Sequence, residues 1–444
     1  MMFGYWLKNW SFNYKLGYGI VRAGLRTFYK KYEVKGLENL PTDGGILFAV
    51  NHQNAFMDPI MVACQLEKNT YYLTRADIFK KKFVAKILGS IYMLPIYRQR
   101  DGVNTITSNE KTFDQCFDIL KEKGCIVIFP EGNHNSQKKL RPLKKGIARI
   151  GLGSANKYSY NNKVYIVPVG LNYSNHTNMG ATLLINFGNP IALEKYYDQH
   201  KNDPSNTINN LVDKVENEMG NLILNIHSSN YEHINDLINI TRKRFHFLSK
   251  ENYSLSNEFE IQKNLIQKIE SLEQKDPNHF KKLIENTQYV SSFLKENNLR
   301  SYLFDDSLKT NNSIILNIFF LFLLLPIHLT GLLSNYLPYK IPVWLVNKKV
   351  KDLHFHSSIK MTLGVILFFL FWSTQFMLIA GFFGLKIGTL YLASLPILAW
   401  FNYQYWIYFL KTKGSLKYRK LKNESKTSKA EKSYNEIIAT LDKL

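Results

Sequence analysis

The sequence GILFAVNHQNAFMDP, residues 45–59, contains the clearest strand-to-helix transition in the chain. Its first six residues are glycine or apolar, which is the length and composition of a buried strand. Asp58-Pro59 is a typical helix start, because Asp can cap the first turn and Pro tolerates the first helical position. The polar residues between them are therefore expected in a loop where a strand ends and a helix begins.

Apolar runs of strand length recur along residues 34–200, and helix-like stretches separate them. The strand-like runs are 45–50, 71–74, 92–97, 125–129, 164–171 and 183–187, and the helix-like stretches lie near 78–88, 107–123 and 143–155. Strands that alternate with helices predict an α/β fold, a layered sheet with helices on both faces. Ligands of such sheets bind at the carboxyl ends of strands, which is where the polar motifs of this sequence lie.

Two residues of the first motif have the chemistry of a general-base pair. A His at a strand end can take a proton from a hydroxyl when a carboxylate holds the imidazole and stabilises its protonated form. His52 and Asp58 fit these roles, and Asn54 between them is a candidate pocket residue. The alternative is structural, with Asp58 acting only as a helix cap, and this stretch alone does not separate the two interpretations.

A second motif, Phe-Pro-Glu-Gly at residues 129–132, follows another strand-like run. It places Pro130, Glu131 and Gly132 at a strand end, ahead of a basic segment that reaches Lys145. A carboxylate followed by cations suits a ligand that carries phosphate. The alternative interpretation is an ordinary turn with solvated lysines.

Two further motifs follow strand-like runs. Arg98 and Arg100 stand on either side of Gln99, and two arginines can bind a phosphate through paired hydrogen bonds. The alternative is a surface ion pair between Arg100 and Asp101. Pro168 interrupts the apolar run 164–171, which predicts an edge strand or an irregular segment that shapes a pocket wall.

Composition limits the classes of partner. The 444 residues carry a formal net charge of +22, which favours phosphate-rich partners such as anionic lipid, phosphorylated substrates or nucleic acid. The sequence contains no recognised nucleic-acid-binding module, so we expect no nucleic-acid partner. The three cysteines form no CxxC motif, which argues against a disulfide scaffold or a Cys-rich zinc site.

The remaining segments point to a membrane. Cations and aromatic rings share a helix in residues 1–33, and residues 205–300 have helical periodicity. Residues 313–333, 361–385 and 387–410 lack charged side chains and are near or above the length that crosses a bilayer. We therefore divide the chain into an amphipathic membrane-surface helix, an α/β domain, a helical extension, membrane-embedded helices and a basic cytoplasmic tail, at residues 1–33, 34–200, 201–310, 311–411 and 412–444.

The order and content of the four motifs resemble the glycerolipid acyltransferase family, which includes glycerol-3-phosphate and 1-acylglycerol-3-phosphate acyltransferases. The resemblance covers about residues 34–190. In that family four residues usually separate the catalytic His and Asp, whereas five separate His52 from Asp58. This spacing is similar to the branch that acylates glycerol 3-phosphate or dihydroxyacetone phosphate.

The resemblance implies a role for each motif. His52 and Asp58 become the catalytic pair. The acceptor phosphate is held by Arg98, Arg100, Glu131, Gly132 and Lys145, and the pocket is lined by Asn54, Pro130 and Pro168. The implied reaction moves a fatty acyl group from acyl-CoA or acyl-carrier protein to a hydroxyl of a glycerol phosphate in phospholipid biosynthesis, without a metal or cofactor.

Three alternatives stay open. They are a lysophospholipid acyltransferase for another head group, a non-catalytic membrane protein that binds anionic lipid, and a metal-dependent hydrolase that uses His52, Asp58 and His134. The resemblance further implies an integral membrane protein whose catalytic domain faces the cytoplasm. Because the loop 334–360 and the tail are both basic, the positive-inside rule predicts that segment 313–333 is re-entrant and that the two later segments form a spanning hairpin.

Overall fold

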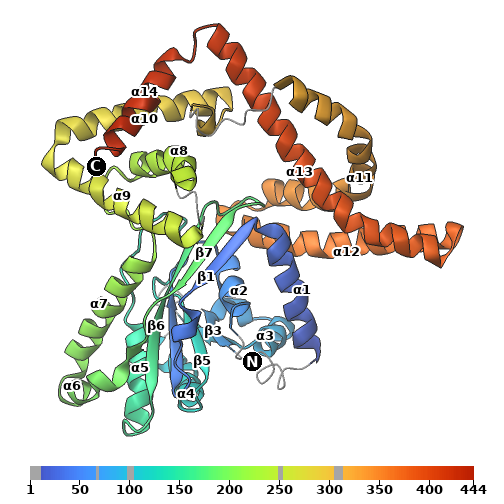
Figure 1. The fold of residues 1–444 in the computed structure, drawn as a ribbon. Helices are drawn as coiled ribbons and strands as arrows, with labels where there is room; N and C mark the ends of the chain where they lie inside the picture. Colours follow the sequence, from blue (N-terminus) through green and yellow to red (C-terminus); the bar gives the residue numbers. More distant parts are fainter. Residues whose placement is uncertain (1–11, 67–69, 98–104, 249–253, 305–313) are drawn as a thin grey trace. The chain divides into compact units, whose positions relative to one another are not determined.

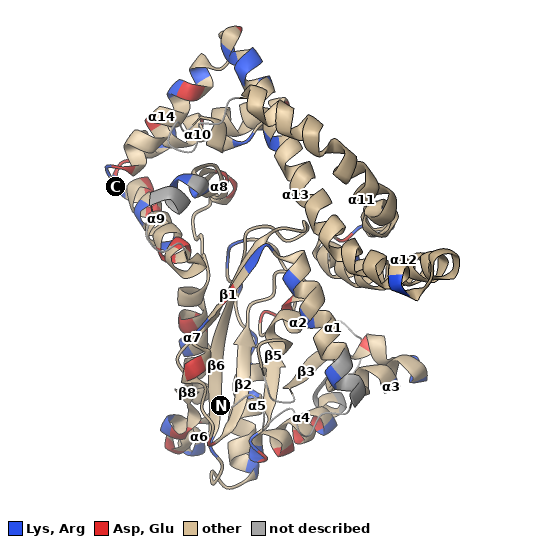
Figure 2. Ribbon diagram, turned by 45° about the vertical axis from the view of Figure 1, so that its right-hand side comes forward, with Lys and Arg blue, Asp and Glu red and all other residues tan. Residues whose placement is uncertain are grey.

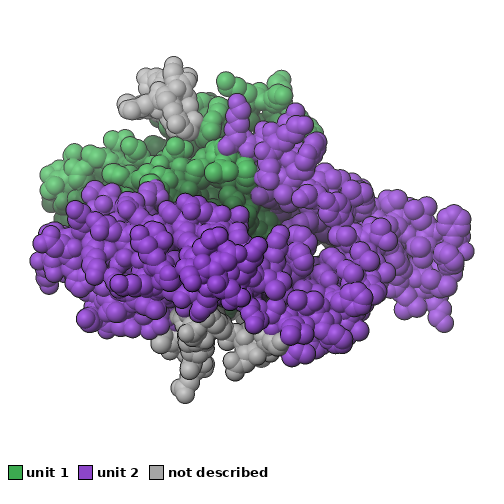
Figure 3. All heavy atoms as spheres, turned by 90° about the horizontal axis from the view of Figure 1, so that it is seen from above, with its two compact units in different colours: residues 1–225, 352–358 green, residues 226–351, 359–444 purple. Residues whose placement is uncertain are grey.

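The computed structural model describes residues 12–66, 70–97, 105–248, 254–304 and 314–444 (Figure 1). The chain divides into two compact units, which Figure 3 distinguishes by colour. Unit 1 comprises residues 1–225 and 352–358, and unit 2 comprises residues 226–351 and 359–444.

Unit 1 is built on a mostly parallel eight-stranded sheet. Its order is β1-β7-β6-β2-β5-β3-β4, with β8 also paired to β6, and the pairs that β6 forms with β7 and β8 are antiparallel. The strands are β1 (Lys31–Lys35), β2 (Gly45–Val50), β3 (Thr70–Arg75), β4 (Met93–Ile96), β5 (Cys125–Ile128), β6 (Val164–Tyr173), β7 (Thr182–Phe187) and β8 (Ile191–Ala192). This confirms the α/β prediction, and every strand-like run of the sequence forms a strand.

Both faces of the sheet are covered, because residues of either parity along β2 are buried. Leu47 lies in one cluster with Ile147 and Leu152, whereas Phe48 points to the other face and is equally buried. Figure 1 shows α1 and α2 on the opposite side of the sheet from α5 and α7. The helices of unit 1 are α1 (Phe12–Phe28), α2 (Met57–Ala63), α3 (Lys82–Ser90), α4 (Thr105–Lys121), α5 (Gly146–Lys157), α6 (Tyr197–Asn202) and α7 (Pro204–Leu222).

Pro168 lies inside the sheet, not on an edge strand as expected. It pairs with Ala49 of β2 on one side of β6. On the other side, β8 pairs up to Ile166 and β7 pairs from Val169 onward. The missing N–H of proline is tolerated because it falls where one partner strand gives way to the next.

Unit 2 is helical. Its helices are α8 (Tyr231–Leu248), α9 (Leu255–Lys275), α10 (Pro277–Asn297), α11 (Ile314–Lys349), α12 (His356–Phe383, whose first three residues belong to unit 1), α13 (Leu385–Asn423) and α14 (Ser428–Leu441). Side-chain caps mark two starts, since Ser254 accepts from Asn257 N and Asp276 accepts from His279 N.

Within the described residues, two helices are apolar and long enough to cross a membrane by length and composition, Ile314–Lys349 and Leu353–Phe383. Figure 2 shows them almost without charged residues. The third expected segment, 387–410, lies in α13 and does not meet the same requirement, because Asn402, Gln404 and several tyrosines lower its hydropathy. α11 is helical from Ile314 through Pro326 to Lys349, and the re-entrant arrangement of segment 313–333 stays a prediction.

Candidate active site

The candidate site lies at the carboxyl ends of β2 and β5, as expected for an open parallel sheet. β2 ends at Val50, and the loop after it leads into α2 at Met57. β5 ends at Ile128, and the second motif follows at once. Because β2 and β5 are neighbours in the sheet, the two motifs start side by side.

His52 and Asp58 form a hydrogen-bonded pair. The distance from His52 Nδ1 to Asp58 Oδ2 is 2.8 Å. Asp58 is fully buried, whereas the His52 side chain is 18% exposed. Among the described residues, none bonds to His52 Nε2, so this nitrogen is available to a substrate hydroxyl. The pair has the geometry of a general base and its orienting carboxylate.

Asp58 is turned toward the loop and does not cap the helix. Its Oδ2 accepts from the backbone N–H groups of Gln53 at 2.8 Å and Asn54 at 2.7 Å. Its Oδ1 accepts from the Tyr173 hydroxyl at 2.7 Å. The helix already begins at Met57, so Asp58 lies in its first turn and the purely structural interpretation does not describe its contacts.

The five-residue spacing is accommodated by a tight turn. Met57 N donates to Asn54 O at 2.8 Å, and Ala55 within this turn has a φ of 36°. Positive φ is unusual for a residue with a side chain, and Ala55 is buried. The loop therefore stores local backbone strain directly between the two members of the pair.

The second motif holds His52 from the other side. Glu131 Oε1 accepts from His52 N at 2.8 Å, and Phe129 stacks on the His52 ring with 4.1 Å between centroids. Glu131 Oε2 accepts from Arg141 Nε at 3.0 Å and from Arg141 N at 3.3 Å. Burial raises the pKa of Glu131, although these hydrogen bonds and the Arg141 charge oppose the rise. Both carboxylate oxygens thus contact groups of the chain itself.

The other predicted residues of this motif surround that contact. Gly132 has a φ of 74° and its N–H donates to Phe129 O at 3.0 Å, so glycine fits this turn. Pro130 O accepts from Lys144 N at 2.8 Å. Lys145 is exposed at the start of α5, and the structure gives it no bond to the His52 loop within the described residues.

Arg98 and Arg100 lie outside the described residues. The chain leads to them from Tyr97, whose N–H donates to Asn109 Oδ1 and whose carbonyl accepts from Asn109 Nδ2, both at 2.9 Å. Tyr97 follows the carboxyl end of β4, and the His52 loop follows the carboxyl end of the parallel strand β2. Pro168 is buried in β6, whose parallel partner is β2.

Two residues of the site carried no signal in the sequence. Tyr173 is the hydroxyl donor to Asp58, and Asn51 joins β2 to β6 by bonding both Leu171 N at 2.7 Å and Leu171 O at 3.1 Å. Both bonds connect positions more than 100 residues apart, which only the sheet register brings together. The only sign of Asn51 in the sequence is its place directly after a buried strand.

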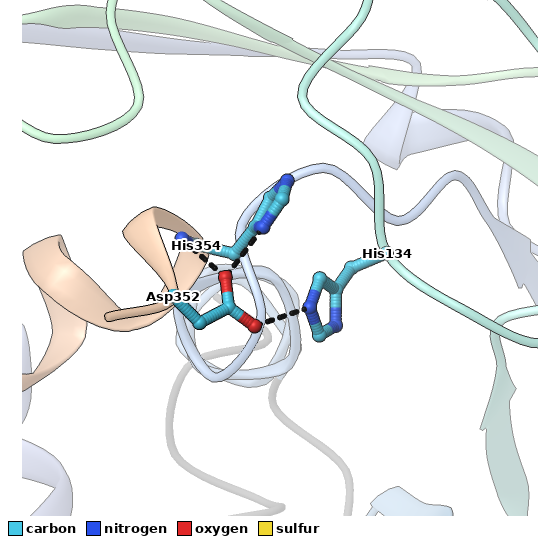
Figure 4. Close-up of side chains that lie close together, drawn as sticks. All are labelled: His134, Asp352 and His354. Atoms are coloured by element: carbon cyan, nitrogen blue, oxygen red, sulfur yellow. Dashed lines mark hydrogen bonds and ion pairs between the residues drawn. The ribbon is translucent and has the colours of Figure 1, made fainter. Parts of the chain in front are cut away.

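A cluster near His52 has the composition of a cation site. His134, Asp352 and His354 place their ligand atoms within 4.8 Å of one another (Figure 4). His134 Nε2 bonds to Asp352 Oδ2 at 3.1 Å, and His354 Nδ1 bonds to Asp352 Oδ1 at 2.7 Å. The His134 ring also lies edge-on to the His52 ring, with 5.6 Å between centroids.

Comparisons with known proteins match the part of the chain that contains this site. A model of the Acyltransferase family matches residues 31–172. Glycerol-3-phosphate O-acyltransferase 2 of Saccharomyces cerevisiae is 35% identical over 112 residues, which are 25% of this chain and 15% of the yeast protein. The 1-acyl-sn-glycerol-3-phosphate acyltransferase of Bacillus subtilis is 28% identical over 131 residues, 29% of this chain and 57% of that protein.

Among solved structures, the 1-acyl-sn-glycerophosphate acyltransferase of Thermotoga maritima is 16% identical, with a TM-score of 0.29, over 45% of this chain and 78% of that chain. The matched region thus spans 15% of the yeast protein and 57% of the bacterial one. It contains the strand β2, the His52–Asp58 pair and the Phe-Pro-Glu-Gly motif. Through residues 31–172 the chain is similar to the acyltransferase family.

Proposed function

We propose that the protein is a membrane-bound glycerolipid acyltransferase that acylates a hydroxyl of a glycerol phosphate. The observation that carries the proposal is the His52–Asp58 pair, with its 2.8 Å hydrogen bond and a ring nitrogen left open to substrate. The family match to residues 31–172 and relatives named for glycerol 3-phosphate and its 1-acyl derivative support the same chemistry.

The transfer needs one general base. His52 Nε2 takes the proton of the acceptor hydroxyl while that oxygen attacks the thioester carbonyl carbon. The carbon–sulfur bond breaks, an ester forms, and the thiolate of CoA or acyl-carrier protein receives the proton from the imidazolium. Asp58 keeps Nδ1 in the donor state and stabilises the positive charge of the imidazolium. General-base catalysis by such a histidine typically contributes about 10²–10⁴-fold to the rate.

The acceptor phosphate is proposed to bind Arg98, with Arg100 and Lys145 adding positive charge. Arginine suits this role because its planar group forms two parallel bonds to phosphate. Glu131 and Gly132 are proposed to act on the acceptor indirectly, since the Glu131 oxygens already hold His52 N and Arg141. Asn54, Pro130 and Pro168 are proposed to shape the pocket.

The membrane is proposed to hold both the protein and its lipid product. Two apolar helices support this, and polar bonds join helices in the same region, such as His328 Nδ1 to Asn402 Oδ1 at 3.0 Å. The net charge of +22 favours an anionic lipid surface. We propose that the catalytic domain faces the cytoplasm, where acyl thioesters are present.

The test is acyl transfer by the purified full chain in lipid nanodiscs. Labelled acyl-CoA or acyl-carrier protein is offered with glycerol 3-phosphate, dihydroxyacetone phosphate, 1-acylglycerol 3-phosphate and lysophospholipids of other head groups in turn. Transfer to a glycerol phosphate that is lost in His52→Ala supports the proposal. Transfer only to another head group, or no transfer at all, would reject it.

A further inference from the structure

Residues 352–358, which we call the strap, belong to unit 1 although the chain on both sides of them belongs to unit 2. The strap contains a short 3-10 helix, Leu353–Phe355, and the first three residues of α12. It lies outside the region 31–172 that matches the acyltransferase family. It contacts two loops of unit 1, residues 51–57 and 133–137.

The first contact reaches the loop between His52 and Asp58. Ser357 Oγ donates to Asn54 Oδ1 at 2.8 Å, and both residues are almost completely buried. The backbone N–H of the same Asn54 donates to Asp58 Oδ2 at 2.7 Å. Asn54 therefore connects Ser357 to Asp58, the carboxylate that orients His52.

The second contact reaches the loop behind His52. Asp352 Oδ2 bonds to His134 Nε2, and His354 Nε2 accepts from Ser136 N at 3.1 Å. Figure 4 shows both imidazole rings against the Asp352 carboxylate. Between these two positions, Asn135 N donates to the carbonyl of His52 at 2.9 Å. The strap thus contacts the chain on both sides of the catalytic histidine.

The Asp352–His134–His354 cluster could be a cation site or a clamp, that is, a set of hydrogen bonds that holds the strap on the loop 133–137. The hydrogen bonds distinguish the two. A His2Asp set is suitable for a divalent cation such as Zn²⁺. However, Ser136 N–H can only donate, so His354 Nε2 is the unprotonated nitrogen and Nδ1 carries the proton that bonds Asp352. Both nitrogens of His354 are therefore engaged, and a cation would have to break one of these bonds.

The charge of Asp352 agrees with the clamp. Its partial burial raises the pKa, but hydrogen bonds from the His354 ring, the His354 backbone and His134 together lower it to about 2. The carboxylate is therefore ionised at neutral pH and accepts three hydrogen bonds. The same bonds fix the strap on the loop 133–137.

We propose that Ser357 is a positioning residue of the acyltransferase site, which orients Asn54 and through it Asp58. The Asp352–His134–His354 cluster anchors the strap to the loop behind His52. The proposal rests on the proposed function for its effect on turnover. It gives the start of the second apolar helix, through Ser357, a role in the site.

The experiment compares Ser357→Ala with Ser358→Ala in the purified full chain. Ser358 is the matched control, since it is also buried and at the start of α12, but its hydroxyl bonds Phe355 O within the strap. We expect Ser357→Ala to lower kcat about tenfold, or ~1.4 kcal/mol, with the acceptor KM nearly unchanged. Ser358→Ala should keep normal kcat. In an Asn54→Ala background, Ser357→Ala should have no further effect, because the two residues act through one bond.

A second measurement needs no turnover. Hydrogen exchange of the peptide covering residues 51–58 should be faster in Ser357→Ala than in Ser358→Ala, because the amides of Gln53 and Asn54 are bonded to Asp58. If the two variants differ in exchange in this way but the unaltered protein transfers no acyl group, the proposed function fails and the strap contact stands.

Two results would overturn the strap proposal. The first is equal exchange and equal kcat in the two serine variants. The second is a stoichiometric zinc ion in the purified protein whose removal by chelator abolishes activity and whose return restores it, with binding lost in Asp352→Asn. That result would show that the Asp352–His134–His354 cluster is a metal site and that its hydrogen bonds do not anchor the strap.

Discussion

Removing the Tyr173 hydroxyl is the most direct test of the role proposed for Asp58, because this hydroxyl donates to Asp58 Oδ1 at 2.7 Å. Burial, together with the Asp58 charge, raises the pKa of Tyr173 well above 10, so the phenol keeps its proton and donates. The substitution Tyr173→Phe keeps the ring in place and removes this one donor. It therefore changes the hydrogen bonding of Asp58 without leaving a large cavity.

The expected magnitude follows from how the donors are shared. His52 Nδ1, Gln53 N and Asn54 N all bond to Oδ2, whereas Tyr173 bonds to Oδ1. Losing a hydrogen bond to a buried charged group costs about 1.5–3 kcal/mol. We expect a stability loss of that order and, because Asp58 can then rotate, a kcat lower by about tenfold, which corresponds to ~1.4 kcal/mol.

Tyr165→Phe is the matched control on the same strand. The Tyr165 hydroxyl donates to Asp43 at 3.0 Å, but this pair is exposed to solvent. Removing an exposed contact usually changes stability by no more than about 0.5 kcal/mol. The control therefore removes the same atom from the same β6 strand without touching the site.

The assay measures kcat at saturating acyl donor and acceptor, and the thermal unfolding midpoint, for both variants in the same nanodiscs. The reasoning is refuted if Tyr173→Phe keeps the kcat and midpoint of Tyr165→Phe. A fall in midpoint with unchanged kcat would show that Tyr173 stabilises the fold without orienting the catalytic pair.

Three further predictions concern other groups of unit 1. His52→Ala should lower kcat by at least about 10² while the protein stays folded by circular dichroism, because it removes the general base. Arg98→Ala should raise the acceptor KM far more than the donor KM, and Arg98→Lys should not restore it, because Lys lacks the two-pronged contact. Burial lowers the pKa of His176 to about 4, so its neutral form stabilises the fold fully above pH 6.5 and this contribution is lost as pH falls toward 4. Between pH 4 and 6.5, the free energy of unfolding should therefore depend less on pH in His176→Gln than in the unaltered protein. The difference in slope is at most the ~1.4 kcal/mol per pH unit that one proton gives.

The central strands β2 and β5 could be predicted from the sequence because unit 1 buries every residue in them. All six residues of β2 are buried, and its apolar run has the bounds of the strand. Pro168 was harder to place, because a proline rule that considers one strand at a time cannot see two partner strands that meet opposite it. The long apolar helix α11 likewise continues through Pro326, although proline usually weakens a helix interior.

The candidate site could be predicted in its chemistry but not in its support. His52, Asp58 and Glu131 lie in short motifs, and the structure brings them into contact. Tyr173 and Ser357 lie 115 and 303 positions from their partners, in segments whose sequence has no distinctive residue. A single hydroxyl carries no pattern, so only the fold reveals which tyrosine and which serine matter.

The five-residue spacing between His52 and Asp58 affects the backbone of the loop that joins them. The extra residue does not lengthen the catalytic contact, since His52 and Asp58 are a normal 2.8 Å apart. The turn at Ala55 absorbs it, at the cost of a positive φ, and Asp58 holds the turn by accepting from Gln53 N and Asn54 N. The spacing therefore acts on the backbone of the loop and not on the proton-transfer distance. We therefore expect discrimination between acceptors to come from groups that contact the acceptor, and the residue to vary is Arg98, which we propose binds its phosphate.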